Sequence, residues 1–197
     1  MYNRVSKYIV SLLQKYNDDL GDKETQEVAV YGIEISLSSI VNYILILIVG
    51  MCVHSVFSAF LFLIVFNGMR KYIGGYHCST YSKCNVTLCL IFALVQFFSK
   101  ISMLYTDLGL LTILLLWCGY GIWFLGPVQN SHKPLTLEQK IRCHKIAKFL
   151  YIFISIMVPL INILDTYYAR IVVFSLASVV ILLPPGKILE RREQYDL

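Results

Sequence analysis

The chain has 197 residues, of which 57% are hydrophobic and only 15% are charged, and its mean hydropathy is +0.67. A soluble domain has about 45–50% apolar and about 25% charged residues, so this composition excludes an ordinary soluble domain. The net charge of +5 fits the one-sided distribution of basic residues in a membrane protein better than it fits nucleic-acid binding. We therefore expect a chain that crosses a membrane several times.

The first 20 residues predict an amphipathic helix. Val5, Ile9 and Leu12 recur at helical spacing, and the other face of the helix is basic and polar. Such a helix is too polar to span a bilayer and is typical of the membrane interface. We assign residues 1–34 to an N-terminal amphipathic helical region that lies in the cytoplasm or at the interface.

Six hydrophobic runs follow, at residues 35–53, 55–69, 86–98, 108–125, 149–164 and 171–183. They predict an all-α polytopic fold with about six transmembrane helices over residues 35–186, followed by a cytoplasmic tail at 187–197. A perpendicular span needs about 20 apolar residues, and the second, third and sixth runs are shorter. A four-span alternative, in which the second and third runs are re-entrant, therefore stays open.

The basic residues predict an orientation. With six spans and a cytoplasmic N-terminus, only Lys100 and Arg170 of the 17 lysines and arginines lie outside the cell. Basic residues collect on the cytoplasmic side of membrane proteins. Both termini and the loops 70–84 and 126–148 are thus expected in the cytoplasm. The four-span alternative keeps the same loops inside.

The segment 70–84, called here the reactive segment, concentrates the residues that carry chemistry. Cysteine and histidine together supply a nucleophile and a base, and a nearby imidazolium favours the thiolate. His77 and Cys84 are seven residues apart. On one helix they would share a side but be separated by about 10.5 Å, whereas catalysis needs about 3 Å. The chain must therefore bend or break near them, and Gly74 and Gly75 allow unusual backbone angles.

Two other interpretations of this segment are weaker. Cys78 is a competing nucleophile, but neighbouring residues on a helix point about 100° apart, so it is disfavoured beside His77 unless it lies in a loop. His77, Cys78, Cys84 and Cys89 could also be metal ligands, but Cys89 falls inside an apolar run and the spacing is poor. We expect no metal and no cofactor.

The residues of the reactive segment resemble those of a known family. Together with a later basic stretch they are similar to the accessory gene regulator B family of Gram-positive bacteria, and the matching positions are Arg70, Gly74-Gly75, His77, Cys84, Gly126-Pro127 and His132-Lys133-Pro134-Leu135. Length, polytopic character and the order of these features agree over essentially the whole chain.

The resemblance implies a membrane-embedded cysteine endopeptidase of quorum sensing, with residues 35–186 as a transmembrane peptidase domain. Its substrate would be a short amphipathic propeptide. Cys84 would cleave off the C-terminal tail and form an acyl-enzyme thioester, from which the peptide cyclises to a thiolactone or lactone. His77 would act first as base and then as acid.

Three further residues are expected to bind substrate or to support the oxyanion: Arg70, Gly75 and Lys133. For Arg70 the alternative is a charge that only sets topology, and the basic residues after Pro134 could equally contact anionic lipid. A homodimer is a further hypothesis, and no nucleic acid is expected as a partner. The rival function is a small peptide transporter or export channel without covalent chemistry. It is disfavoured because ionisable residues are scarce inside the apolar runs.

Overall fold

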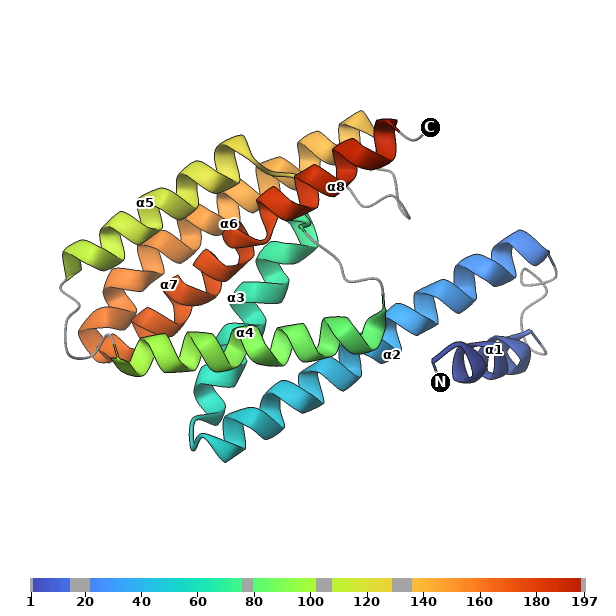
Figure 1. Cartoon of the computed structure of the whole chain (residues 1–197), viewed down its shortest axis with the longest axis horizontal. Helices are drawn as coiled ribbons and strands as arrows, with labels where there is room; N and C mark the ends of the chain where they lie inside the picture. The colour runs from blue at the N-terminus through green and yellow to red at the C-terminus, as the bar shows by residue number, and fades with distance from the viewer. Residues whose placement is uncertain (1, 15–21, 76–79, 102–107, 129–135, 196–197) are drawn as a thin grey trace. The chain divides into compact units, whose positions relative to one another are not determined.

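The computed structural model describes residues 2–14, 22–75, 80–101, 108–128 and 136–195 (Figure 1). Every regular element in these ranges is a helix, which confirms the all-α prediction. In chain order the helices are α1 (Tyr2–Leu13), α2 (Lys23–Cys52), α3 (Val56–Ile73), α4 (Tyr81–Ile101), α5 (Leu108–Phe124), α6 (Leu137–Leu164), α7 (Thr166–Ile181) and α8 (Leu183–Tyr195).

The chain divides into two compact units, Met1–Leu45 and Ile46–Leu197. In the first unit α1 buries Val10 and is joined to α2 by a hydrogen bond of 2.8 Å from Asn3 Nδ2 to Glu34 Oε1. Its apolar residues Val5, Tyr8, Leu12 and Leu13 remain exposed. An exposed apolar face on a short amphipathic helix is what an interfacial helix presents to lipid. The domain bounds expected at residues 34 and 186 stay a prediction.

Helix α7 is the centre of the second unit. It contacts α3, α4, α5 and α6, and most of its residues are buried. Figure 1 shows α5, α6 and α7 lying side by side. The surrounding helices expose large apolar side chains such as Ile64, Leu116 and Phe149. Lipid covers such surfaces in a membrane, so the small buried core does not conflict with the high apolar content.

The helix lengths support about six spans. Five helices of the described residues are long and apolar enough to cross a membrane, and the 17-residue α5 is a shorter apolar helix. The doubtful second and third runs correspond to α3 and α4, of 18 and 21 residues. At 1.5 Å per residue these are about 27 and 31 Å long, close to the hydrocarbon thickness of about 30 Å. Both are continuous helices, which favours six spans over re-entrant segments.

Two helices extend beyond the expected boundaries. The stretch 126–148 was expected as a loop, but α6 begins at Leu137. Thr136 starts it with a capping box: its Oγ1 accepts from Gln139 N at 3.3 Å, while its own N donates to Gln139 Oε1 at 3.1 Å. Such reciprocal bonds satisfy two N–H groups of the helix start. The basic residues that follow are therefore helical. Most of the expected C-terminal tail likewise lies in α8.

The sixth hydrophobic run begins earlier than predicted, so Arg170 lies inside a helix and not in the segment before it. Helix α7 begins earlier, at Thr166, because Asp165 Oδ1 caps it by accepting a hydrogen bond of 2.8 Å from Tyr167 N. Arg170 consequently lies in the second turn of α7 and is only 4% exposed.

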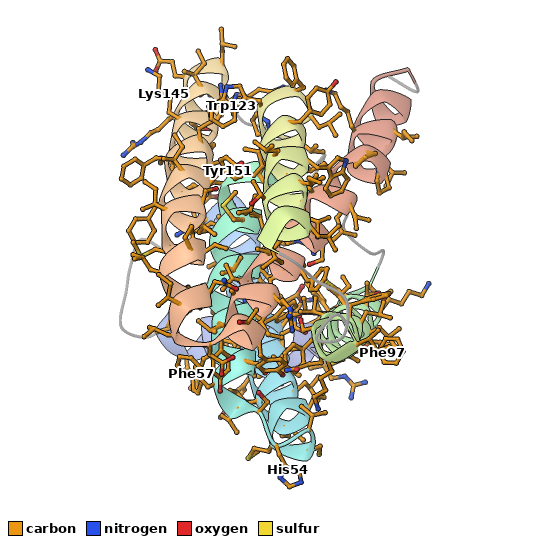
Figure 2. All side chains as sticks on the ribbon, turned by 90° about the vertical axis from the view of Figure 1, so that its left-hand side faces the viewer. His54, Phe57, Phe97, Trp123, Lys145 and Tyr151 are labelled. Carbon is orange, nitrogen blue, oxygen red and sulfur yellow. The ribbon has the colours of Figure 1, made fainter. Side chains whose placement is uncertain are left out.

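The helices of the second unit place basic and aromatic residues at two opposite ends (Figure 2). Lys145 and Trp123 lie at one end, and His54, Phe57 and Phe97 lie at the other. Between them Phe62 stacks on Phe66, with ring centroids 5.1 Å apart. The end marked by Lys145 is called here the basic end.

Candidate functional site

The reactive segment begins with a sharp turn at the end of α3. Gly74 caps the helix through a hydrogen bond of 2.9 Å from its N to Arg70 O, with φ +74° and ψ −143°. Gly75 follows with φ +126°. Positive φ angles of this kind are adopted readily only by glycine. The two glycines therefore end the helix and redirect the chain.

Two segments distant in sequence hold this turn. Val128 N donates a hydrogen bond of 2.9 Å to Ile73 O. A Cβ atom on Gly74 would lie 2.1 Å from Val128 O, and one on Gly75 would lie 3.4 Å from Leu182 O. Ile73, Gly74 and Gly75 are called here the base of the reactive segment. Their backbone packs against the backbone of Val128, after α5, and of Leu182, at the junction of α7 and α8.

Cys84 lies in the first turn of α4. Its N donates to Thr80 O at 3.1 Å, and Thr80 Oγ1 accepts from Lys83 N at 3.4 Å. The Cys84 side chain is half-buried, and the neighbouring Asn85 is buried. The first turn of a helix has unpaired N–H groups and the positive end of the helix dipole, which favour a thiolate over a thiol. This position suits a nucleophilic cysteine.

The structure describes three of the five predicted site residues. Arg70 is half-buried in the last turn of α3, with Cζ 5.4 Å from the centroid of the Phe66 ring. Gly75 is buried at the base of the reactive segment, and Cys84 lies as given above. His77 and Lys133 lie outside the described residues, and so does the competing Cys78. The helix that carries Cys84 begins at Tyr81, so the expected break between His77 and Cys84 is confirmed.

The first turns of α6 are fixed to α5 near this turn. Lys148 Nζ lies 4.9 Å from the centroid of the Trp123 ring, and His144 Nε2 lies 3.2 Å from Ile122 O. Val128, which bonds the base of the reactive segment, follows α5 by four residues. The basic turns of α6 and the reactive segment are therefore attached to the same end of the bundle.

Sequence reasoning missed the contacts of Val128 and Leu182, because they involve backbone atoms and leave no side-chain pattern. Within the described ranges, no group of three or more His, Cys, Asp or Glu residues could hold a metal ion. That the protein needs no metal or cofactor stays a prediction.

The comparison with protein families gives one match. The family model described as "AgrB: Accessory gene regulator B" matches residues 6–183, which include the reactive segment and the basic residues that follow Pro134. No curated protein and no solved structure matches the chain.

Proposed function

The chain belongs to the accessory gene regulator B family, whose members process autoinducer peptides, and we propose that it is a membrane-embedded cysteine endopeptidase that also prepares its product for cyclisation. Its substrate is a short amphipathic propeptide with a C-terminal tail. The observation that carries the proposal is the place of Cys84, in the first turn of α4, the next helix after the glycine turn that ends α3.

The chemistry requires two acyl transfers. The thiolate of Cys84 adds to a backbone carbonyl of the propeptide, and the tail leaves as an amine that takes a proton from His77. A thioester between the peptide and Cys84 results. An internal thiol or hydroxyl of the peptide then gives its proton to His77 and attacks the thioester, which closes the ring and returns Cys84 as a thiolate.

Arg70, Gly75 and Lys133 have supporting roles in this proposal. Arg70 and Lys133 attract acidic groups of the tail or stabilise the tetrahedral oxyanion. The structure suggests a different role for Gly75, since its buried backbone packs against Leu182. We propose that Gly75 positions the reactive segment rather than touching substrate.

The membrane determines where these steps occur. We propose that the basic end faces the cytoplasm, together with both termini, because basic residues collect on that side. An amphipathic propeptide then reaches Cys84 by binding to the inner lipid surface. Water is scarce at such a site, which protects the thioester from hydrolysis before the ring closes. A homodimer and direct lipid binding belong to the same proposal as separate hypotheses.

Co-expression with candidate short propeptides tests the function. The cleaved tail and the cyclic peptide are measured by mass spectrometry in wild type, Cys84→Ser and His77→Ala. Both variants should abolish the two products, since one lacks the thiolate and the other lacks the proton carrier. Cys89→Ser is the matched control, because Cys89 lies on the same helix and is also half-buried, and it should retain both products.

Two results would contradict the proposal. Processing that persists in Cys84→Ser would exclude Cys84 as the nucleophile. Loss of product in Cys78→Ser with normal processing in Cys84→Ser would move the role to Cys78. Transport of an uncut peptide that does not depend on either cysteine would instead support the rival export channel.

A further inference from the structure

A buried positive charge lies inside the helix bundle. Arg170, in the second turn of α7, is 4% exposed and is the charged member of the buried core among the described residues. Its Nε and Nη1 atoms are buried and have no hydrogen-bond partner in the structure. A buried charge without a partner costs several kcal/mol, so some group must compensate it.

Polar side chains from three helices meet at Tyr167, close to Arg170 along α7. Tyr167 is one turn before Arg170 on the same face of α7, and its hydroxyl donates to Gln96 Oε1 of α4 and lies 3.4 Å from Ser55 Oγ. Gln96 Nε2 in turn donates to Ser58 Oγ of α3. These residues, Tyr167, Ser55, Gln96 and Ser58, are called here the polar lining. Their hydrogen bonds are made to one another, whereas Nε and Nη1 of Arg170 have no partner.

This lining is at the end of the bundle opposite the basic end. The rings of Phe57 and Tyr168 meet with centroids 4.9 Å apart, which places the start of α7 beside the start of α3. Phe57 and His54 mark that end in Figure 2, and Lys145 marks the other. Gln96 is twelve residues beyond Cys84, or about 18 Å along α4, so the lining is separate from the candidate active site.

The nearest acidic residue along α7 does not compensate Arg170. Asp165 is exposed, and its Oδ1 already accepts from Tyr167 N. Asp165 is the N-cap with an extended backbone (φ −158°, ψ 115°), and its side chain is engaged at the start of the helix. It therefore leaves the charge of Arg170 uncompensated.

We propose that Arg170 is the cationic centre of a binding site for a small oxyanion, a phosphate or a carboxylate. The guanidinium group presents N–H donors in a planar fork that matches two oxygens of such a group. Nε and Nη1 are both buried N–H donors without a partner, so they are available to such an oxyanion. The source is either a free anion or the phosphate of a lipid headgroup, because Arg170 is about 6 Å from Thr166 at the start of α7 and so near headgroup depth.

Thermal unfolding of the full chain tests the site. The melting temperature is measured in neutral detergent with increasing inorganic phosphate or acetate, against chloride at equal ionic strength. Ligand at about 100 times Kd should raise the wild-type melting temperature by about 5–10 °C. Arg170→Gln should lose this shift, whereas Lys100→Gln should retain it, since Lys100 is an exposed cation in the last turn of α4.

Lipid discs distinguish the two sources. A headgroup ligand predicts a higher melting temperature in discs with anionic phospholipid than in neutral discs. This increase should be absent in Arg170→Gln. If Arg170→Gln does not fold, Arg170→Lys replaces it: the charge is kept and the fork is lost, so half-saturation should need about ten-fold more phosphate.

Three outcomes would overturn the proposal. One is an equal shift in wild type and Arg170→Gln, and another is no shift in any condition. The third is a shift in wild type that chloride produces as strongly as phosphate or acetate does, because the effect would then not be specific for an oxyanion.

Discussion

Replacing Gly74 by alanine tests how the reactive segment is anchored. The backbone there has φ +74° and ψ −143°, a region that costs about 1–3 kcal/mol for a residue with a side chain. The added Cβ would also lie 2.1 Å from Val128 O, so the Val128–Ile73 hydrogen bond must stretch, at a further cost of about 1 kcal/mol. We expect a loss of about 2–4 kcal/mol in stability, or roughly 5–15 °C in melting temperature.

Gly68→Ala is the matched control for this experiment. Gly68 lies in the same helix, and its added Cβ would meet nothing within 4 Å. Alanine there should leave the melting temperature unchanged or raise it slightly, since alanine is favoured over glycine in helices by about 1 kcal/mol. Both variants are unfolded by heat in detergent, and alkylation of Cys84 is timed in the folded state. If Gly74→Ala has the same melting temperature as Gly68→Ala, and its Cys84 is alkylated at the wild-type rate, Val128 does not anchor the reactive segment.

Three other substitutions test the bundle itself. Tyr151→Phe should cost about 1 kcal/mol, because the hydroxyl donates a hydrogen bond of 2.8 Å to a carbonyl of α5, whereas the exposed Tyr120→Phe should cost nothing measurable by the same thermal assay. Thr136→Ala should cost about 0.5–2 kcal/mol by removing the cap of α6, and full stability of that variant, or equal loss in Thr136→Ser, would contradict the capping box. Gly121→Ala should lower the melting temperature by several degrees, because its Cβ would lie 2.3 Å from Val180 Cγ1, and a wild-type value would show that α5 and α7 are not so closely packed.

The all-helical class and the approximate number of spans could be predicted because they depend on composition and on runs of apolar residues. The break before Cys84 could also be predicted, because helix geometry separates His77 and Cys84 too widely and two glycines stand nearby. These features are local, and each can be recognised in a short window of sequence.

The place of Arg170 could not be predicted in the same way. A cation beside an apolar run is usually a flanking residue at the membrane surface. Its burial depends on α7 being surrounded by four helices, a property of the tertiary arrangement. The start of α6 was missed for a related reason, since lysines between apolar residues are equally compatible with a loop and with a helix end.

The bond between Val128 N and Ile73 O has a consequence for genetic screens. Because both atoms belong to the backbone, almost any side chain at position 128 or 73 leaves the bond intact. Alanine at either position would lower stability only by removing a buried side chain, so an alanine scan would not report the backbone bond. Only proline at position 128 removes the donor, so a proline scan of the residues after α5 is the screen that can detect how the end of α3 is joined to the segment after α5.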